Sequence, residues 1–149
     1  MTPNASLDAA AQPVPGPVLD LTRLASARLD TPEALGHRFA DCAAEGDLEG
    51  IVALYAADAV VSLPSGREAA GPRAIRAAFA GALAAGADLR IESVGRPIIT
   101  GSLACTCSTD VTGRVHTQVA RREPDGSWRW IRDGSRLREP VVPRIEHLG

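Results

Sequence analysis

Lysine is absent from this chain of 149 residues, and all 16 of its basic residues are arginine. The 18 acidic residues leave a formal net charge of −2, and the arginines form no long basic run. Proteins that bind nucleic acid usually carry a strongly basic face, so we expect no nucleic-acid partner.

Cysteine and long apolar runs are scarce as well. The three cysteines, Cys42, Cys105 and Cys107, form no CxxC pair and have no histidine at metal-ligand spacing, which predicts buried, reduced thiols and no metal site. No stretch approaches the roughly 18 apolar residues of a membrane span, and the first basic residue is Arg23. We therefore expect neither a transmembrane helix nor a signal peptide, no membrane partner, and a cytoplasmic location.

The placement of proline and large apolar residues predicts one domain between two irregular tails. Residues 1–30 hold four of the 11 prolines and few large apolar side chains, and residues 140–149 hold two more prolines. Residues 31–139 are enough for one hydrophobic core without disulfides. Because the core pattern begins at Leu35, we expect the domain to fold without residues 1–30.

Periodicity and turn residues predict an α+β fold. Helical spacing is found over 32–45, from Leu48 to Tyr55, and over 72–85, opened by Thr31-Pro32, Asp47 and Pro72 respectively. Strand-like segments cover 59–63, a short stretch ending at 71, and about 88–99, 102–112, 114–123 and 127–137. Short connections between the later strands imply antiparallel pairing, so a curved sheet is expected to wrap the helices on one face.

Three sequence segments resemble a known superfamily. They are AEGDLEGIVALYAADAV at 44–60, GPRAIR at 71–76 and DGSWRW at 125–130. In this order they resemble the ketosteroid-isomerase branch of the NTF2-like superfamily, which includes the SnoaL-like polyketide cyclases. The resemblance spans about residues 32–137. It implies an NTF2-like α+β barrel: a cone-shaped, mostly antiparallel sheet around three N-terminal helices, an apolar pocket at the open end, and a homodimer formed through the outer sheet face.

The resemblance also implies that the steroid-isomerase machinery is missing. The position of the catalytic base falls on Leu63, those of two tyrosines on Phe39 and Phe79, and that of a protonated aspartate on Arg122. Leucine cannot accept a proton and phenylalanine cannot donate one, so we expect no ketosteroid isomerase activity. Phe39, Leu63 and Phe79 are expected to line the ligand pocket.

Other polar side chains are therefore the candidates for catalysis. If position 122 faces the cone, as the resemblance implies, alternation places His116, Gln118 and Arg122 on that face. His116 is either a general acid–base or a strand histidine with a structural partner. Arg122 either binds a carboxylate or enolate, or pairs with Asp110 or Asp133.

Further candidates come from neighbouring elements. Tyr55, placed near the pocket by the resemblance, either donates a hydrogen bond to a ligand or packs in the core. Cys105, Cys107 and Thr109 share one strand face that is expected to line the cone, and a nucleophilic cysteine there would need His116 as its base.

The arginine pairs and the outer face of the sheet are the last features of this region. The arginine pairs 121/122 and 136/138 are interpreted as solvated or ion-paired. The dimer face is expected to carry some of Val115, Thr117 and Val119 together with Trp128 or Trp130.

Two functions stay open. The first is a SnoaL-like enzyme that needs no cofactor and moves a proton on a small apolar, polyketide-like metabolite by isomerisation, cyclisation or dehydration, with His116, Arg122 and Tyr55 as catalytic residues. The second is a non-catalytic ligand-binding or dimerisation module. A pocket of roughly 300–1,000 Å³ with convergent polar groups would favour catalysis or binding, and a filled cone would favour a scaffold.

Overall fold

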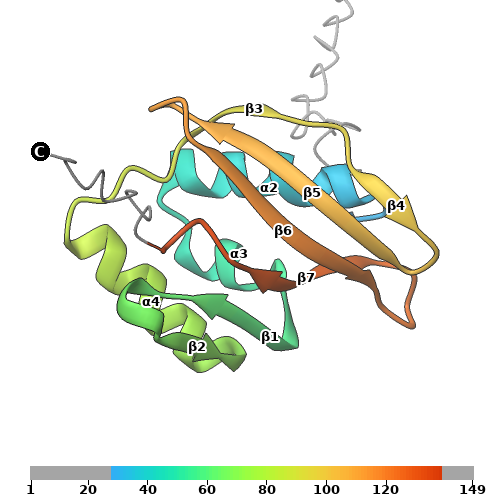
Figure 1. Cartoon of the computed structure of the whole chain (residues 1–149), viewed down its shortest axis with the longest axis horizontal. Coiled ribbons are helices and arrows are strands. Elements are labelled where there is room, and N and C mark those ends of the chain that lie inside the picture. Colours follow the sequence, from blue (N-terminus) through green and yellow to red (C-terminus); the bar gives the residue numbers. More distant parts are fainter. Residues whose placement is uncertain (1–27, 139–149) are drawn as a thin grey trace, which may run out of the picture.

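The computed structural model describes residues 28–138 as three helices packed on one face of a curved sheet (Figure 1). Most of the two tails inferred from the sequence lies outside the described residues. The helices are α2 (Pro32–Glu45), α3 (Leu48–Val52) and α4 (Gly71–Ala84), with a short 3₁₀ turn η1 (Pro64–Gly66). The strands are β1 (Tyr55–Ser62), β2 (Glu68–Ala70), β3 (Ile91–Val94), β4 (Ile98–Thr100), β5 (Leu103–Asp110), β6 (Val115–Arg122) and β7 (Trp128–Asp133).

The first helix begins and ends where the sequence predicts, and the second helix begins where it predicts. Thr31 Oγ1 accepts the backbone N–H of Ala34 at 3.3 Å, and Pro32 occupies the first helical position. Gly46 ends α2 in the left-handed region, at φ 67°, where glycine carries no side-chain penalty. Asp47 then caps α3, its Oδ1 accepting the N–H of Gly50 at 2.9 Å. Among residues 28–138, no helix is both long and apolar enough to cross a bilayer.

The predicted second helix is too long. α3 ends at Val52, and Tyr55 opens β1, where it pairs in parallel with Trp130 of β7. The helical spacing from Leu48 to Tyr55 indicated a helix that continues, but a helix this short is marginal on its own. Pairing with β7, which includes a 2.9 Å hydrogen bond from the Trp130 N–H to the Leu54 carbonyl, decides the conformation instead.

The sheet is open and mostly antiparallel. Its strands run in the order β2-β1-β7-β6-β5-β3, with β4 also paired to β5, and only β1 and β7 are parallel. The predicted strand 88–99 is thus two strands, β3 and β4, that share one partner. Register shifts in the β1–β7, β3–β5 and β6–β7 pairs mark bulges, which bend a sheet and help it to curve around the helices. The predicted α+β fold is confirmed, although the sheet does not close into a barrel.

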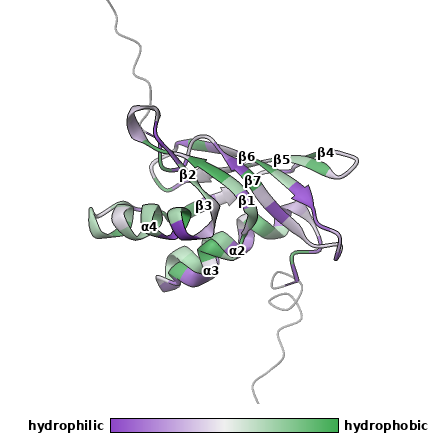
Figure 2. Ribbon diagram, turned by 90° about the horizontal axis from the view of Figure 1, so that it is seen from below, coloured by the Kyte–Doolittle hydropathy of each residue, from purple (hydrophilic) through white to green (hydrophobic). Residues whose placement is uncertain are grey.

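The concave face of the sheet carries the core. Figure 2 shows all three helices on one side of the sheet, where α2 packs on β3, β5 and β7, and α4 packs on β1 and β2. Four buried aromatic rings, those of Phe39, Tyr55, Phe79 and Trp130, lie with centroids 5.3–6.1 Å apart in neighbouring pairs. This cluster forms part of the hydrophobic core.

Leu29 belongs to the core, although the sequence analysis assigned it to the tail of residues 1–30. Its side chain is buried, and its carbonyl accepts the N–H of Trp128 at 2.8 Å. A single leucine carries no periodicity that could have revealed this. The core therefore begins before Leu35, and deleting residues 1–30 would remove part of it.

Candidate functional site

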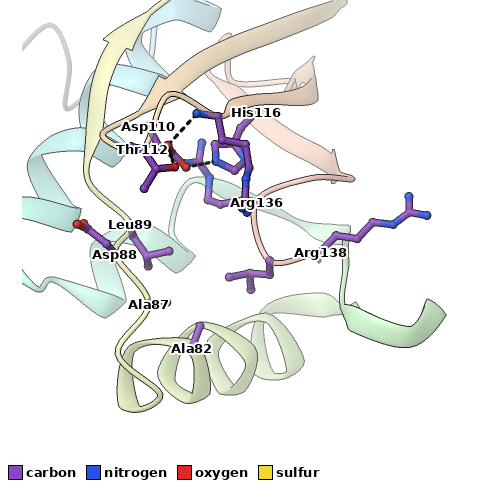
Figure 3. A pocket seen from close by; sticks show the side chains of 11 residues that line it. Ala82, Ala87, Asp88, Leu89, Asp110, Thr112, His116, Arg136 and Arg138 are labelled. Carbon is purple, nitrogen blue, oxygen red and sulfur yellow. Dashed lines mark hydrogen bonds and ion pairs between the residues drawn. The ribbon is translucent and has the colours of Figure 1, made fainter. Parts of the chain in front are cut away.

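A cavity of about 350 Å³ opens between α4, the segment 87–89, the β5–β6 turn and the chain that follows β7 (Figure 3). Its apolar lining consists of Ala82, Ala87, Leu89 and Leu137, and its polar lining of Asp88, Asp110, Thr112, Arg114, His116, Arg136 and Arg138. The volume lies at the lower end of the range for small-molecule sites. Of the groups in this wall, His116 and Asp110 are paired with each other.

The hairpin between β5 and β6 brings His116 and Asp110 together. His116 Nε2 and Asp110 Oδ2 are 2.8 Å apart, and His116 is only 3% exposed. An ionised carboxylate accepts hydrogen bonds and cannot donate one, so the imidazole proton must lie on Nε2. In the neutral ring, Nδ1 therefore keeps its lone pair and can act as a base.

Asp110 is held in its ionised form. Its Oδ1 accepts the N–H and the hydroxyl of Thr112 at 2.8 and 2.6 Å, and the N–H of Arg114 at 3.1 Å. Burial raises the pKa of Asp110, but the hydrogen bonds from Thr112, His116 and the backbone outweigh it and hold the pKa well below its usual range. The carboxylate that orients His116 therefore stays charged at neutral pH.

Nδ1 of His116 has no hydrogen-bond partner within residues 28–138, and it is fully buried. The same holds for Arg136 Nε and Gln118 Nε2. A buried polar atom without a partner costs about 1–3 kcal/mol. Two of these three atoms, His116 Nδ1 and Arg136 Nε, belong to residues that line the same cavity.

Tyr55, Asp133 and Arg136 form a second polar cluster, which reaches the cavity through Arg136. The Tyr55 hydroxyl donates to Asp133 Oδ2 at 2.7 Å, and Arg136 Nε lies 3.7 Å from the same oxygen. Burial, together with the negative charge of Asp133, raises the pKa of Tyr55 well above its usual value, so the hydroxyl keeps its proton. The Arg136 guanidinium stacks 3.9 Å above the Phe39 ring and donates to Ser108 Oγ at 3.3 Å.

Comparison with known families decides the identity of this fold. The family described as the SnoaL-like domain matches residues 37–138, a stretch that contains the cavity residues from Ala82 to Arg138. The chain belongs to the SnoaL-like domain family. No curated protein matches the chain.

Solved structures agree with this SnoaL-like fold. A ketosteroid isomerase-like protein from Erwinia carotovora atroseptica superposes with a TM-score of 0.54 at 17% identity, covering 72% of this chain and 93% of that one. An NTF2-like protein with a cystatin-like fold from Novosphingobium aromaticivorans gives 0.53 at 22% identity, covering 79% and 90%. A putative calcium/calmodulin-dependent protein kinase type II association domain from Thiobacillus denitrificans gives 0.55 at 20% identity, covering 70% and 92%. At these identities the likeness establishes the fold alone.

Within this SnoaL-like domain, Arg122 and His116 do not share a site. Both belong to β6, but six residues along a strand span roughly 20 Å. Arg122 is exposed and lines a different hollow, beside the start of α2 and Trp128. It forms no ion pair with Asp110 or Asp133, which instead pair with His116 and Arg136. Tyr55, from the start of β1, uses its hydroxyl on Asp133 and does not line the cavity.

Cys105, Cys107 and Thr109 lie on the outer face of the sheet, so the prediction that they line the cone is wrong. Cys105 is exposed, whereas Thr106, Ser108 and Asp110 of the same strand are buried toward the helices. Alternation gives two possible faces for β5, and the sequence alone suggested the wrong one. Because His116 faces inward, it cannot serve as the base of either cysteine.

The other residues predicted for the pocket do not line the cavity. Phe39 and Phe79 are fully buried in the aromatic cluster, and Leu63 packs half-buried against the core. Gln118 faces inward as expected, but its Oε1 accepts the Thr106 hydroxyl at 3.0 Å, away from the cavity. Trp128 and Trp130 are buried as well, so neither contributes to the outer face.

The sequence did not reveal that Asp110 is the partner of His116 or that Arg136 is buried. Asp110 was considered only as a possible partner of Arg122, although the turn residues Thr112-Gly113 predict a hairpin that returns the chain toward it. Arg136 was interpreted as solvated or ion-paired at the surface, and it is 7% exposed. Nothing in its local sequence indicates burial, because Gly134 and Ser135 beside it are typical of a loop.

We expect Asp110 to make stability depend on acid pH. Its pKa is lower in the folded chain than in the unfolded chain, so its contribution is present above about pH 4 and is lost as the pH falls toward the folded pKa. The difference in unfolding free energy between the wild type and Asp110→Asn should therefore shrink from about pH 5 to about pH 2. Urea unfolding at both pH values measures this difference, and a constant difference would contradict the prediction.

Proposed function

We propose that this SnoaL-like domain is an enzyme that moves a proton on a small metabolite bound in the cavity of about 350 Å³. His116 Nδ1 would abstract the proton, and Asp110 would hold the imidazole in the required tautomer and stabilise the imidazolium that forms. The substrate class we propose is a mainly apolar, polyketide-like compound that is isomerised, cyclised or dehydrated without a cofactor.

The observation that carries the proposal is the His116–Asp110 pair, with Nδ1 buried beside the cavity and without a partner within residues 28–138. A histidine with a purely structural role would be expected to use both ring nitrogens. A bound substrate would give Nδ1 its missing partner. Because Nδ1 is covered, side chains of the cavity wall must move before a substrate can reach it.

A neutral carbon acid tests the proposal without knowledge of the natural substrate. 5-Nitrobenzisoxazole loses one C–H proton to a base, its N–O bond breaks, and the coloured nitrophenolate product is measured by absorbance. We expect the wild type to open this ring faster than the same concentration of free imidazole. A rate no higher than that of free imidazole at the same pH would contradict the proposal.

The alternative function, a dimerisation module, is favoured by a separate observation and is compatible with catalysis. Four large apolar residues of the outer sheet face are exposed: Ile98 at 74%, Leu103, Val115 and Val119. Cys105 pairs directly with both Ile98 and Val119 on neighbouring strands, so these side chains share one face. An association domain is among the proteins of similar fold. We propose that this outer face joins two copies of the chain.

Light scattering tests the dimer. At micromolar concentration the wild type should show twice the mass of one chain, because an exposed apolar face of this kind is unfavourable in a monomer. Val119→Glu should shift the mass to that of a monomer, since it places a charge in the middle of the face. The control Ala77→Glu changes an exposed position on α4, on the opposite side of the sheet, and should leave the dimer intact. A monomeric wild type would contradict the proposal.

A further inference from the structure

Arg136 is a buried cation with more hydrogen-bond donors than partners. A guanidinium carries five N–H donors. One of them reaches Ser108 Oγ at 3.3 Å, and Nε–H has no hydrogen-bond partner among residues 28–138. The nearest acidic oxygen, Asp133 Oδ2, is 3.7 Å from Nε, which is too long for a hydrogen bond. Arg136 also lines the cavity, so its unused donors belong to a residue that faces a possible ligand.

Asp133 compensates the charge of Arg136 without accepting a hydrogen bond from its Nε–H. Oδ2 of Asp133 accepts the Tyr55 hydroxyl at 2.7 Å. Its Oδ1 accepts the backbone N–H groups of Ser135 at 3.3 Å and Arg136 at 3.1 Å. The carboxylate is thus occupied by groups other than the guanidinium, so a second acceptor can bind Arg136 without displacing it.

The remaining acidic groups of the cavity wall also have partners. Asp88 pairs with Arg90 at 2.7 Å, and Asp110 pairs with His116 at 2.8 Å. Arg114, in the β5–β6 turn, adds a positive charge to the wall and forms no ion pair with another described residue. In Figure 3, Arg138 extends away from the other labelled side chains, whereas Arg136 lies beside the His116–Asp110 pair. Arg114 therefore adds an unmatched positive charge to the wall, whose acidic groups all have partners.

We infer that the cavity recognises a small carboxylate with an apolar body, and that Arg136 binds its carboxylate group. Stacking on Phe39 fixes the plane of the guanidinium, which favours the planar, edge-on geometry of an arginine–carboxylate pair. Ala82, Ala87, Leu89 and Leu137 would contact the apolar body. This inference rests on the proposed function because it names the substrate class for the same cavity.

The strand register connects Arg136 to the proposed base. Ser108, which accepts the hydrogen bond from Arg136, pairs directly with His116 across β5 and β6. A carboxylate held by Arg136 would therefore place the carbon atoms next to it near the imidazole. The same arrangement would orient such a substrate for proton abstraction by His116.

Isothermal titration calorimetry with hexanoate and with hexanamide tests the inference, because the two probes share their apolar chain and differ in charge. We expect hexanoate to bind the wild type about 10- to 100-fold more tightly than hexanamide, as charged hydrogen bonds allow. Hexyl phosphate is the third probe. Tighter binding of hexyl phosphate than of hexanoate would overturn the carboxylate assignment, as would equal binding of hexanoate and hexanamide or no binding of either.

Two variants separate recognition from folding. Arg136→Met should abolish the preference for hexanoate, but it leaves Asp133 as a buried charge without a cation and can unfold the chain. The double variant Asp133→Asn/Arg136→Met removes both charges and should stay folded without the preference. The control Arg73→Met, at an exposed position of α4, should keep the preference for hexanoate. A hexanoate preference that survives in the folded double variant would overturn the inference.

The outcomes for this inference and for the proposed function are distinct. 5-Nitrobenzisoxazole is uncharged, so its turnover by the wild type does not require a carboxylate site. Turnover without a preference for hexanoate would overturn the inference alone. A preference for hexanoate without turnover would overturn the proposed proton transfer and leave the carboxylate site standing.

Discussion

The variant His116→Gln is expected to open the ring of 5-nitrobenzisoxazole about 10²–10⁴-fold more slowly than the wild type, the usual effect of losing a general base. Glutamine is close to histidine in length and can still donate a hydrogen bond to Asp110, but it cannot accept the substrate proton. The ring-opening rate of the variant should fall to that of a protein without a base in the cavity. Absorbance of the nitrophenolate product measures both rates.

His37 provides the matched control, because it is an exposed histidine on α2. His37→Gln makes the same chemical change away from the cavity and should keep the wild-type rate. Asp110→Asn should also slow the reaction, since a side-chain amide no longer forces the imidazole proton onto Nε2. A folded His116→Gln protein that retains the wild-type rate would eliminate His116 as the base.

The second large effect is expected from Asp133→Ala, which should lower the free energy of unfolding by about 3–5 kcal/mol, the typical cost of breaking a buried ion pair from one side. The change leaves the Arg136 charge buried among aromatic rings without a counter-ion. It also removes the acceptor at 2.7 Å from the Tyr55 hydroxyl. Urea unfolding followed by circular dichroism gives the difference.

The double variant Asp133→Asn/Arg136→Met is the comparison that identifies the cause. It removes the same ion pair but leaves no isolated charge, so it should lose much less stability than Asp133→Ala. Two equally destabilised variants would indicate that packing, and not the isolated charge, sets the cost. An Asp133→Ala protein within about 0.5 kcal/mol of the wild type would show that the pair does not stabilise the fold.

Local signals in the sequence were enough for the helices α2 and α4 and for the hairpins. Thr31, Pro32, Gly46 and Asp47 act on backbone groups within a few residues, so their effect is the same in the sequence and in the fold. The order of the elements and three short segments also indicated the family that residues 37–138 match. Inward-facing His116 and Gln118 followed from the resemblance, which placed position 122 in the cone, together with alternation along the strand.

Only the tertiary structure decided which side chains meet. Tyr55 continues a helical spacing, yet pairing with Trp130, 75 positions later in the chain, makes it a strand residue. The face of β5 could not be chosen from its sequence, because polar and small residues occupy both sets of alternate positions. Contacts between distant segments determine such choices, and no local pattern encodes them.

The candidate site shows the same division. The sequence, through its resemblance to the superfamily, predicted an inward-facing His116 and the absence of the steroid-isomerase base and donors. The tertiary structure decided that Asp110 is the partner of His116, that Arg122 lies at the far end of the strand, and that Arg136 is buried. Burial of Arg136 depends on Phe39, Ser108 and Asp133, which come from three different elements. A charged loop residue becomes part of a site only when the fold brings such partners around it.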